Sequence, residues 1–264
     1  MIIYCLLYTL TGVAAGVFAG LFGLGGGVII VPILTFLFTS QQMPEQHILH
    51  MALGTSLASI LFTSLASMRA HHRRGAVHWP LVKRIAPGIL IGAFAGSWMA
   101  AQISTRALKI FFVVFLFYVA SRIFMHVKPP MKKTFSSTTF FGVGTGIGAI
   151  SSLVGIGGGT MSVPFLLRCN ISMHHAIGTS AAIGFPIALA GAVGYWINGS
   201  RVLGLPSHTL GYIYLPALLF VSLASITTAP LGAKIAHKLP VARLKMVFAC
   251  LLFMMGLKML AGLF

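Results

Sequence analysis

The sequence predicts an all-α polytopic membrane protein of two inverted repeats, with about eight to ten membrane segments that include short helices broken by glycine. Three observations support this fold class: an apolar composition, a succession of long apolar runs, and a glycine-rich motif that occurs twice. Hydrophobic residues make up 58% of the 264 residues and charged residues only 7%. A soluble domain carries about 25% charged residues, so the composition excludes an ordinary soluble protein.

The few charged residues are almost all basic, with 18 Lys and Arg against a single Asp or Glu and a formal net charge of +17. Such an excess is typical of nucleic-acid binding only where Lys and Arg gather on a solvated surface. In this chain they separate long apolar runs. We therefore expect the lipid bilayer as a partner and no nucleic acid.

Chemistry that depends on carboxylates or thiols has little support in the chain. Glu45 is the single acidic residue, which excludes paired carboxylates for acid–base catalysis, carboxylate cages for metal ions and Asp/Glu proton relays. Cys5, Cys169 and Cys250 lack CxxC spacing, so a disulfide or zinc framework is not expected. We expect no enzyme, no cofactor and no metal site.

Ten apolar runs are expected to be helices, because an isolated strand would leave its backbone unpaired in lipid. They cover residues 2–22, 28–38, 48–68, 85–101, 108–125, 138–154, 160–168, 175–197, 211–229 and 244–263. The first has no basic segment before it and is interpreted as a membrane segment rather than a signal peptide. The second and seventh are too short to span a bilayer at a rise of 1.5 Å per residue. Both follow glycine-rich stretches, so each is either half of a re-entrant hairpin or a tilted span.

Two blocks of sequence occur twice. Residues 12–34 align with residues 144–166, where both copies read G-[LI]-G-G-G-x3-V-P. A second block, H-x3-G-T-S, begins at His50 and again at His174. Each half then holds five elements, and an odd number of crossings inverts one half relative to the other. We expect a first membrane repeat at 1–126, a basic cytoplasmic linker at 127–137 and a second repeat at 138–264.

The basic residues give the expected orientation. On one side of the predicted topology lie fourteen of them, namely Arg69, Arg73, Arg74, Lys83, Arg84, Arg122, Lys128, Lys132, Lys133, Arg168, Lys234, Lys238, Arg243 and Lys245. On the other side lie Arg106, Lys109, Arg201 and Lys258. Cytoplasmic loops carry the excess of Lys and Arg. The side with the larger number is therefore expected in the cytoplasm, with both termini outside it.

The glycine motifs are the first candidate binding site. Gly25, Gly26 and Gly27 in the first half, and Gly157, Gly158 and Gly159 in the second, let the backbone leave helical geometry and bring amides close to a ligand. A helix that starts there directs unpaired amides and a partial positive charge at the break, which suits an oxyanion. Pro32 and Pro164 contribute to the structural break. The alternative is close helix packing, which we favour for Gly12, Gly16, Gly144 and Gly148. No GK[ST] follows, so ATP coupling is not indicated.

The repeated G-T-S block supplies hydroxyls at the start of the third element of each half. Thr55, Ser56, Thr179 and Ser180 either donate to the oxygen atoms of a bound anion or bond back to their own helix. His50 and His174 precede these blocks, and histidine is the side chain type whose charge can change near neutral pH, so both are candidates for gating or proton coupling. A structural hydrogen bond is the alternative for each. The segment HHRRGAVHW at 71–79 is expected to be a cytoplasmic loop that touches anionic headgroups.

Two copies of G-x-G-G-G-x3-V-P, each followed by G-T-S in a basic chain of this length, resemble the sulfite exporter TauE/SafE family, also called the 4-toluene sulfonate uptake permease family. The resemblance covers essentially the whole chain. It implies a transporter of the bacterial inner membrane that moves sulfur-containing anions such as sulfite or organosulfonates. The chain has no intramembrane carboxylate, so coupling through an acidic residue is not expected.

The sequence therefore predicts a secondary transporter, with export as the direction that the resemblance implies, working by alternating access on a small sulfur-containing oxyanion. A passive anion channel and a transporter of a non-sulfur carboxylate stay open as alternatives. The coupling ion, proton or sodium, and the oligomeric state also stay open.

Overall fold

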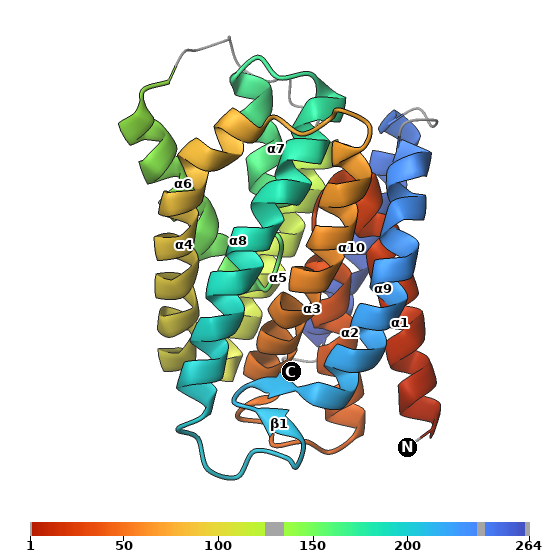
Figure 1. Cartoon of the computed structure of the whole chain (residues 1–264). Coiled ribbons are helices and arrows are strands. Elements are labelled where there is room, and N and C mark those ends of the chain that lie inside the picture. Colours follow the sequence, from red (N-terminus) through yellow and green to blue (C-terminus); the bar gives the residue numbers. More distant parts are fainter. Residues whose placement is uncertain (1, 125–134, 237–240, 262–264) are drawn as a thin grey trace.

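The computed structural model describes residues 2–124, 135–236 and 241–261, and it is helical almost throughout (Figure 1). Its helices are α1 (Ile2–Phe22), α2 (Gly27–Ser40), α3 (Ile48–His72), α4 (Trp79–Gln102), α5 (Thr105–Phe124), α6 (Ser137–Val154), α7 (Gly159–Arg168), α8 (Met173–Gly199), α9 (Leu215–Ala236) and α10 (Val241–Ala261). Two short strands, β1 (Thr209–Leu210) and β2 (Ile213–Tyr214), form an antiparallel hairpin. Within the described residues, six of the helices are long and apolar enough to cross a membrane. The chain is therefore an all-α polytopic membrane protein, as predicted.

Several boundaries differ from the predicted segments, and the starts of the ninth and fourth helices have a clear physical reason. The ninth helix begins at Leu215 instead of residue 211, because the β1–β2 hairpin occupies the preceding residues with Gly211 in the left-handed region at φ 57°. The fourth begins at Trp79 instead of residue 85, because Pro80 lies in its first turn, where a missing amide hydrogen costs nothing. Charged residues such as Lys83 had set the predicted start too late.

The short helices α2 and α7 return the chain to the end from which it came. Figure 1 shows α1 rising from the lower end and α2 descending to it again, whereas α6 and α7 do the same from the upper end. The hydroxyl of Tyr4, at the start of α1, donates to the carbonyl of Ser40 at the end of α2 (3.3 Å). The two ends of the α1–α2 hairpin therefore lie together, so this pair forms a hairpin that opens at one end of the bundle.

The most extensive helix packing is between the two halves of the chain, with α1 on α9, α4 on α6, α3 on α8, α4 on α8, α3 on α9 and α5 on α10. Glycine lets the helices approach closely at these interfaces, which we call glycine seams. A Cβ on Gly16 would lie 2.6 Å from the carbonyl oxygen of Ser225, and one on Gly148 would lie 2.4 Å from that of Ile89. The packing role predicted for these small residues is confirmed. Most of the linker predicted at 127–137 lies outside the described residues. The inverted relation between the halves stays a prediction.

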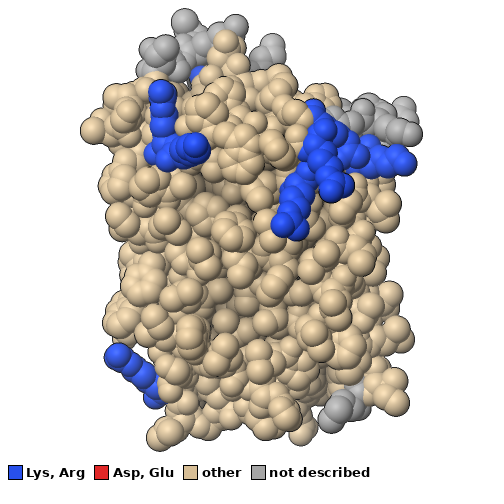
Figure 2. Space-filling model, in the orientation of Figure 1, with Lys and Arg blue, Asp and Glu red and all other residues tan. Residues whose placement is uncertain are grey.

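Basic side chains gather at one end of the bundle, the upper end in Figures 1 and 2. On the face shown in Figure 2, Lys and Arg form two groups there, the middle of the molecule shows none, and the lower end shows one group. Within the described part of the chain, the helix ends and loops at the upper end carry Arg69, Arg73, Arg74, Lys83, Arg84, Arg122, Arg168 and Lys234. Lys128, Lys132, Lys133 and Lys238 lie outside the described residues. The bare middle fits a lipid-facing band.

Candidate functional site

The two glycine breaks meet inside the bundle and cross as antiparallel non-helical segments. A Cβ built on Gly25 would lie 3.0 Å from the Cα atom of Gly157, and the reverse construction gives the same distance. The Gly157 amide donates to the carbonyl of Leu24 (3.2 Å). On either side of this contact, Gly27 faces the Gly155 carbonyl and Gly159 faces the Gly23 carbonyl. The two motifs, far apart in sequence, therefore form one structure.

Glycine is required at the crossing for two physical reasons. Gly26 and Gly158, which immediately precede α2 and α7, have φ values of 82° and 77°, in the left-handed region that other residues rarely adopt. At Gly27 and Gly159 the angle is ordinary, but a Cβ would lie only 2.1 Å and 2.4 Å from the facing carbonyl oxygens. The absence of side chains at Gly25, Gly27, Gly157 and Gly159 therefore lets the two backbones come into contact.

Two helix N-termini point into the crossing. Among the described residues, the first amides of α2 and α7, those of Gly27 and Gly159, have no backbone acceptor. Each helix also places the positive end of its dipole there. Glu45, the single carboxylate side chain of the protein, is exposed in the loop after α2, so no buried carboxylate balances these charges. The electrostatics of the crossing therefore favour an anion over a cation.

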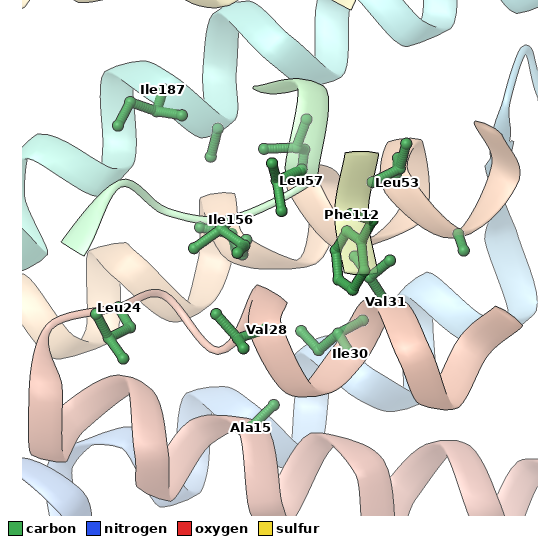
Figure 3. Close-up of a cluster of buried hydrophobic side chains, with 14 of the residues drawn as sticks. Ala15, Leu24, Val28, Ile30, Val31, Leu53, Leu57, Phe112, Ile156 and Ile187 are labelled. Carbon is green, nitrogen blue, oxygen red and sulfur yellow. The ribbon is translucent and has the colours of Figure 1, made fainter. Parts of the chain in front are cut away.

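Apolar side chains surround the crossing in this conformation. Figure 3 shows Leu24 and Ile156 projecting from the two non-helical segments, with Val28, Leu57 and Ile187 close by. A Cβ on Gly158 would lie 2.3 Å from the Cδ1 atom of Ile187. The contact between the two backbones leaves no space for an oxyanion, so the segments must separate before one can bind between them.

Ser56 and Ser180 lie against the crossing, each bonded to the break of the other half. The Ser56 hydroxyl donates to the Gly155 carbonyl (2.8 Å), and the Ser180 hydroxyl donates to the Gly23 carbonyl (3.0 Å). Both serines are fully buried. The sequence left two alternatives open for these hydroxyls, donation to a bound anion and a bond back to their own helix. The bonds in the structure are of neither kind. The hydroxyls instead join the two halves in this conformation.

Thr55 and Thr179 hold the starts of two other helices. The Thr55 hydroxyl accepts from the Tyr214 amide, just before α9, and the Thr179 hydroxyl accepts from the His78 amide, just before α4, both at 2.9 Å. Each threonine therefore satisfies a donor at a helix N-terminus. These bonds direct the threonine hydroxyls away from the glycine breaks.

The two histidines predicted for gating have different surroundings. His50 is 3% exposed, stacks on Tyr212 with ring centroids 5.2 Å apart, and places its Nε2 atom 3.1 Å from the carbonyls of Ala100 and Ile103. That geometry fits a ring that donates to the end of α4. His174 is exposed at the start of α8. A shared gating role stays a hypothesis.

The two predicted proline positions lie inside the short helices rather than at the breaks. Both α2 and α7 continue through their prolines, Pro32 and Pro164. Pro32 is buried, whereas Pro164 is exposed. The helix interruptions themselves fall at the glycines that precede α2 and α7. Each proline still leaves the carbonyl four residues earlier without its helical donor.

A cluster of buried hydroxyls on α3 and α9 was missed in the sequence. Thr63 places its hydroxyl 2.5 Å from that of Ser225, and Ser59 and Ser222 lie one turn earlier on the two helices. The four-residue spacing of Thr55, Ser59 and Thr63 was a signal that could have drawn attention to it. Within the described residues, no group of three or more His, Cys, Asp or Glu side chains could hold a metal ion.

The chain is similar to known membrane proteins over nearly its full length. A family model described as sulfite exporter TauE/SafE matches residues 8–259. A probable membrane transporter protein of Haemophilus influenzae is 37% identical over 98% of this chain and 99% of its own length. A second, of Methanocaldococcus jannaschii, is 28% identical over 96% of this chain and 94% of its own. The YunE protein of Bacillus subtilis is 26% identical over 94% of both chains. No solved structure matches the chain.

A bundle of membrane-spanning helices with two broken helices in its interior, together with these relatives, defines a multi-pass membrane transporter. Within that class, the chain belongs to the sulfite exporter TauE/SafE family.

Proposed function

We propose that the protein carries a small sulfur-containing oxyanion, such as sulfite or an organosulfonate, across the bacterial inner membrane by alternating access. The family description names a sulfite exporter, and the sulfur-containing substrate and the export direction rest on it. The chemistry of an oxyanion rests on this chain's own residues. The inverted arrangement of 1–126 and 138–264 belongs to the same proposal, as does the cytoplasmic position of the basic end.

One observation carries the proposal: two helix N-termini meet at the crossing with no buried carboxylate to balance them. Helix N-termini with free amides bind oxyanions, and discontinuous helices form the substrate sites of many secondary transporters. Gly25, Gly26 and Gly27, with Gly157, Gly158 and Gly159, would supply the amides once the segments separate. Ser56 and Ser180 would then release their carbonyl partners, and their hydroxyls could donate to the anion.

The closed crossing supports a carrier rather than an open pore. The two backbones are in contact, and apolar side chains cover them (Figure 3). Binding between the segments requires them to separate, and release requires the same contact to re-form behind the anion. A passive channel would instead need a continuous opening past this point. Counterflow of labelled sulfite against unlabelled sulfite in proteoliposomes distinguishes the two when the membrane potential is held at zero, because only a carrier then accumulates the label above its outside concentration.

The test is a single added methyl group at the crossing. Gly157→Ala places a Cβ 3.0 Å from both the Gly25 Cα atom and the Leu24 carbonyl oxygen, at a residue whose φ is not in the left-handed region. Overpacking of this kind typically costs about 1–3 kcal/mol, so we expect flux of labelled sulfite to fall by about tenfold. Gly146→Ala is the control, because a Cβ there meets nothing within 4 Å.

Normal flux in a folded Gly157→Ala protein would contradict the assignment of the crossing. The substrate class has its own test, a thermal-shift screen of the purified protein with sulfite, thiosulfate, sulfate, sulfonates and carboxylates. Stabilisation by carboxylates alone would remove the sulfur assignment and leave the anion site in place.

A further inference from the structure

A polar stripe runs along α3 inside the bundle. Thr55, Ser59, Thr63 and Ser67 follow one another at intervals of four residues, and none is more than 1% exposed. Residues four apart lie on neighbouring turns of one helix face. Buried polar side chains are expensive in a membrane interior and generally mark a function there. The stripe therefore calls for an explanation beyond packing.

The oxygen atoms are densest where α3 meets α9. The hydroxyl of Thr63 lies 2.5 Å from that of Ser225 and 3.0 Å from the carbonyl oxygen of Ser59. The Ser225 hydroxyl lies 3.1 Å from the Ser222 carbonyl oxygen. Ser222, itself 6% exposed, has a buried hydroxyl with no partner among the described residues. Five neutral oxygen atoms thus come from two adjacent turns of two helices.

The other half of the protein has no such cluster at the equivalent interface. By the repeat in the sequence, Ile183 and Ile187 on α8 stand where Ser59 and Thr63 stand on α3. Gly16 faces the carbonyl oxygen of Ser225 on α9 as its repeat counterpart Gly148 faces that of Ile89 on α4. By this correspondence, Ala86 and Ile89 on α4 stand where Ser222 and Ser225 stand on α9. Ile187 and Ile89 are fully buried. The fold therefore packs these equivalent positions with apolar residues, and the hydroxyls on α3 and α9 are not a structural necessity.

We propose that the hydroxyls of Thr63, Ser222 and Ser225, with the carbonyl oxygens of Ser59 and Ser222, form a binding site for a sodium ion. Hard cations prefer oxygen ligands, and carbonyls with hydroxyls can replace a hydration shell. The set holds no carboxylate, so it suits a single positive charge better than a divalent ion. It holds no group that titrates near neutral pH, so a proton has nowhere to reside on it.

The position of this site relates it to the crossing. Ile60, whose Cγ2 atom would lie 2.8 Å from a Cβ on Gly25, precedes Thr63 by one helical turn. A sodium ion at this site and an anion at the crossing would be neighbours, and opposite charges attract strongly in a low-dielectric interior. A bound sodium ion would therefore favour an anion at the crossing, and the two ions would be bound together. This linkage rests on the proposed function, whereas the cation site itself does not.

Sodium binding can be measured without any transport. The purified protein in detergent is titrated with NaCl against choline chloride at constant ionic strength, and its melting temperature is recorded. We expect a saturable rise in melting temperature for the wild type. Thr63→Val and Ser225→Ala should each raise the half-saturating sodium concentration by at least about tenfold. Thr63→Ser keeps the hydroxyl and should retain the response.

The matched control is Thr35→Val on α2. Thr35 is buried and its hydroxyl donates to the carbonyl four residues earlier (2.8 Å), as that of Thr63 does, but no second hydroxyl from the described part of the chain bonds to it. Its sodium response should equal that of the wild type. A wild type indifferent to sodium, an equal response to potassium, or an unchanged response in Thr63→Val and Ser225→Ala would each overturn the sodium site. Sulfite flux in proteoliposomes tests the transport proposal separately, so either can fail alone.

Discussion

Single hydroxyls connect the two halves at the crossing. Ser56 and Ser180 make equivalent bonds, each to a carbonyl in the glycine break of the opposite half. A buried carbonyl that loses its donor costs about 1–3 kcal/mol. The pair therefore stabilises the conformation seen in the structure, and the proposed separation of the segments would break both bonds.

We expect Ser56→Ala and Ser180→Ala each to lower the stability of the protein by about 1–2 kcal/mol. The measurement is the temperature at which half of the detergent-solubilised protein remains monodisperse by size exclusion. Ser40→Ala serves as the control, because Ser40 is exposed and its hydroxyl bonds only within its own helix end. If Ser56→Ala and Ser180→Ala melted at the same temperature as the Ser40→Ala protein, a role for the cross-half bonds would be contradicted.

Individual residue environments were the part least predictable from the sequence. His50 and His174 occupy the same position in the repeated block, yet one is buried and the other exposed. A duplication copies the residue but not the surroundings, which come from other elements. For His50 these are the end of α4 and the turn at Tyr212, and neither is visible in the local motif.

At the scale of helices, glycine seams determine which elements pack together. On the α4–α6 seam, a Cβ on Gly92 would lie 2.0 Å from the Thr145 carbonyl oxygen, whereas one on Gly142 would meet nothing within 4 Å. Both glycines lie inside helices. Because alanine favours both helices by about 1 kcal/mol over glycine, the two substitutions differ only in packing.

Gly92→Ala is therefore expected to destabilise the protein by about 1–3 kcal/mol, whereas Gly142→Ala should leave it unchanged or slightly more stable. Thermal melting of both variants in the same detergent provides the comparison. Equal melting temperatures would mean that the helices shift apart without cost and that close contact at this seam is unimportant.

The helices themselves were largely predictable, because hydropathy and span length restrict a membrane segment strongly. The glycine motifs also predicted that α2 and α7 would be short and would start at a break. Their antiparallel crossing was not predictable from either motif, since each supplies only one of the two touching backbones. The hairpin at 209–214 was missed because strands of two residues carry no periodic signal.

Across the whole molecule, the distribution of charge is the feature that sets orientation. Leu203, between α8 and β1, is 95% exposed at the lower end, and Arg73, in the loop after α3, is exposed at the upper end. Positive residues are retained on the cytoplasmic side. The upper end should therefore face the cytoplasm and the lower end the opposite compartment.

Single cysteines at these two positions test the orientation, in a background where Cys5, Cys169 and Cys250 are serine. A membrane-impermeant maleimide should label Leu203→Cys in intact cells and Arg73→Cys only after lysis. Labelling in the opposite order would reverse the topology. Labelling of both in intact cells would indicate that the cells are leaky, which an impermeant probe of a cytoplasmic marker protein detects.

The packing of first-half helices on second-half helices also affects how the protein is inserted into the membrane. The seam of α1 is completed by α9, and that of α4 by α6. Because α1 is synthesised before α9, its glycine face is expected to contact lipid or another protein until α9 has been inserted. Long-range contacts of this kind form late and slowly. The protein is consequently expected to depend on insertion chaperones and to be sensitive to pauses in translation before α9.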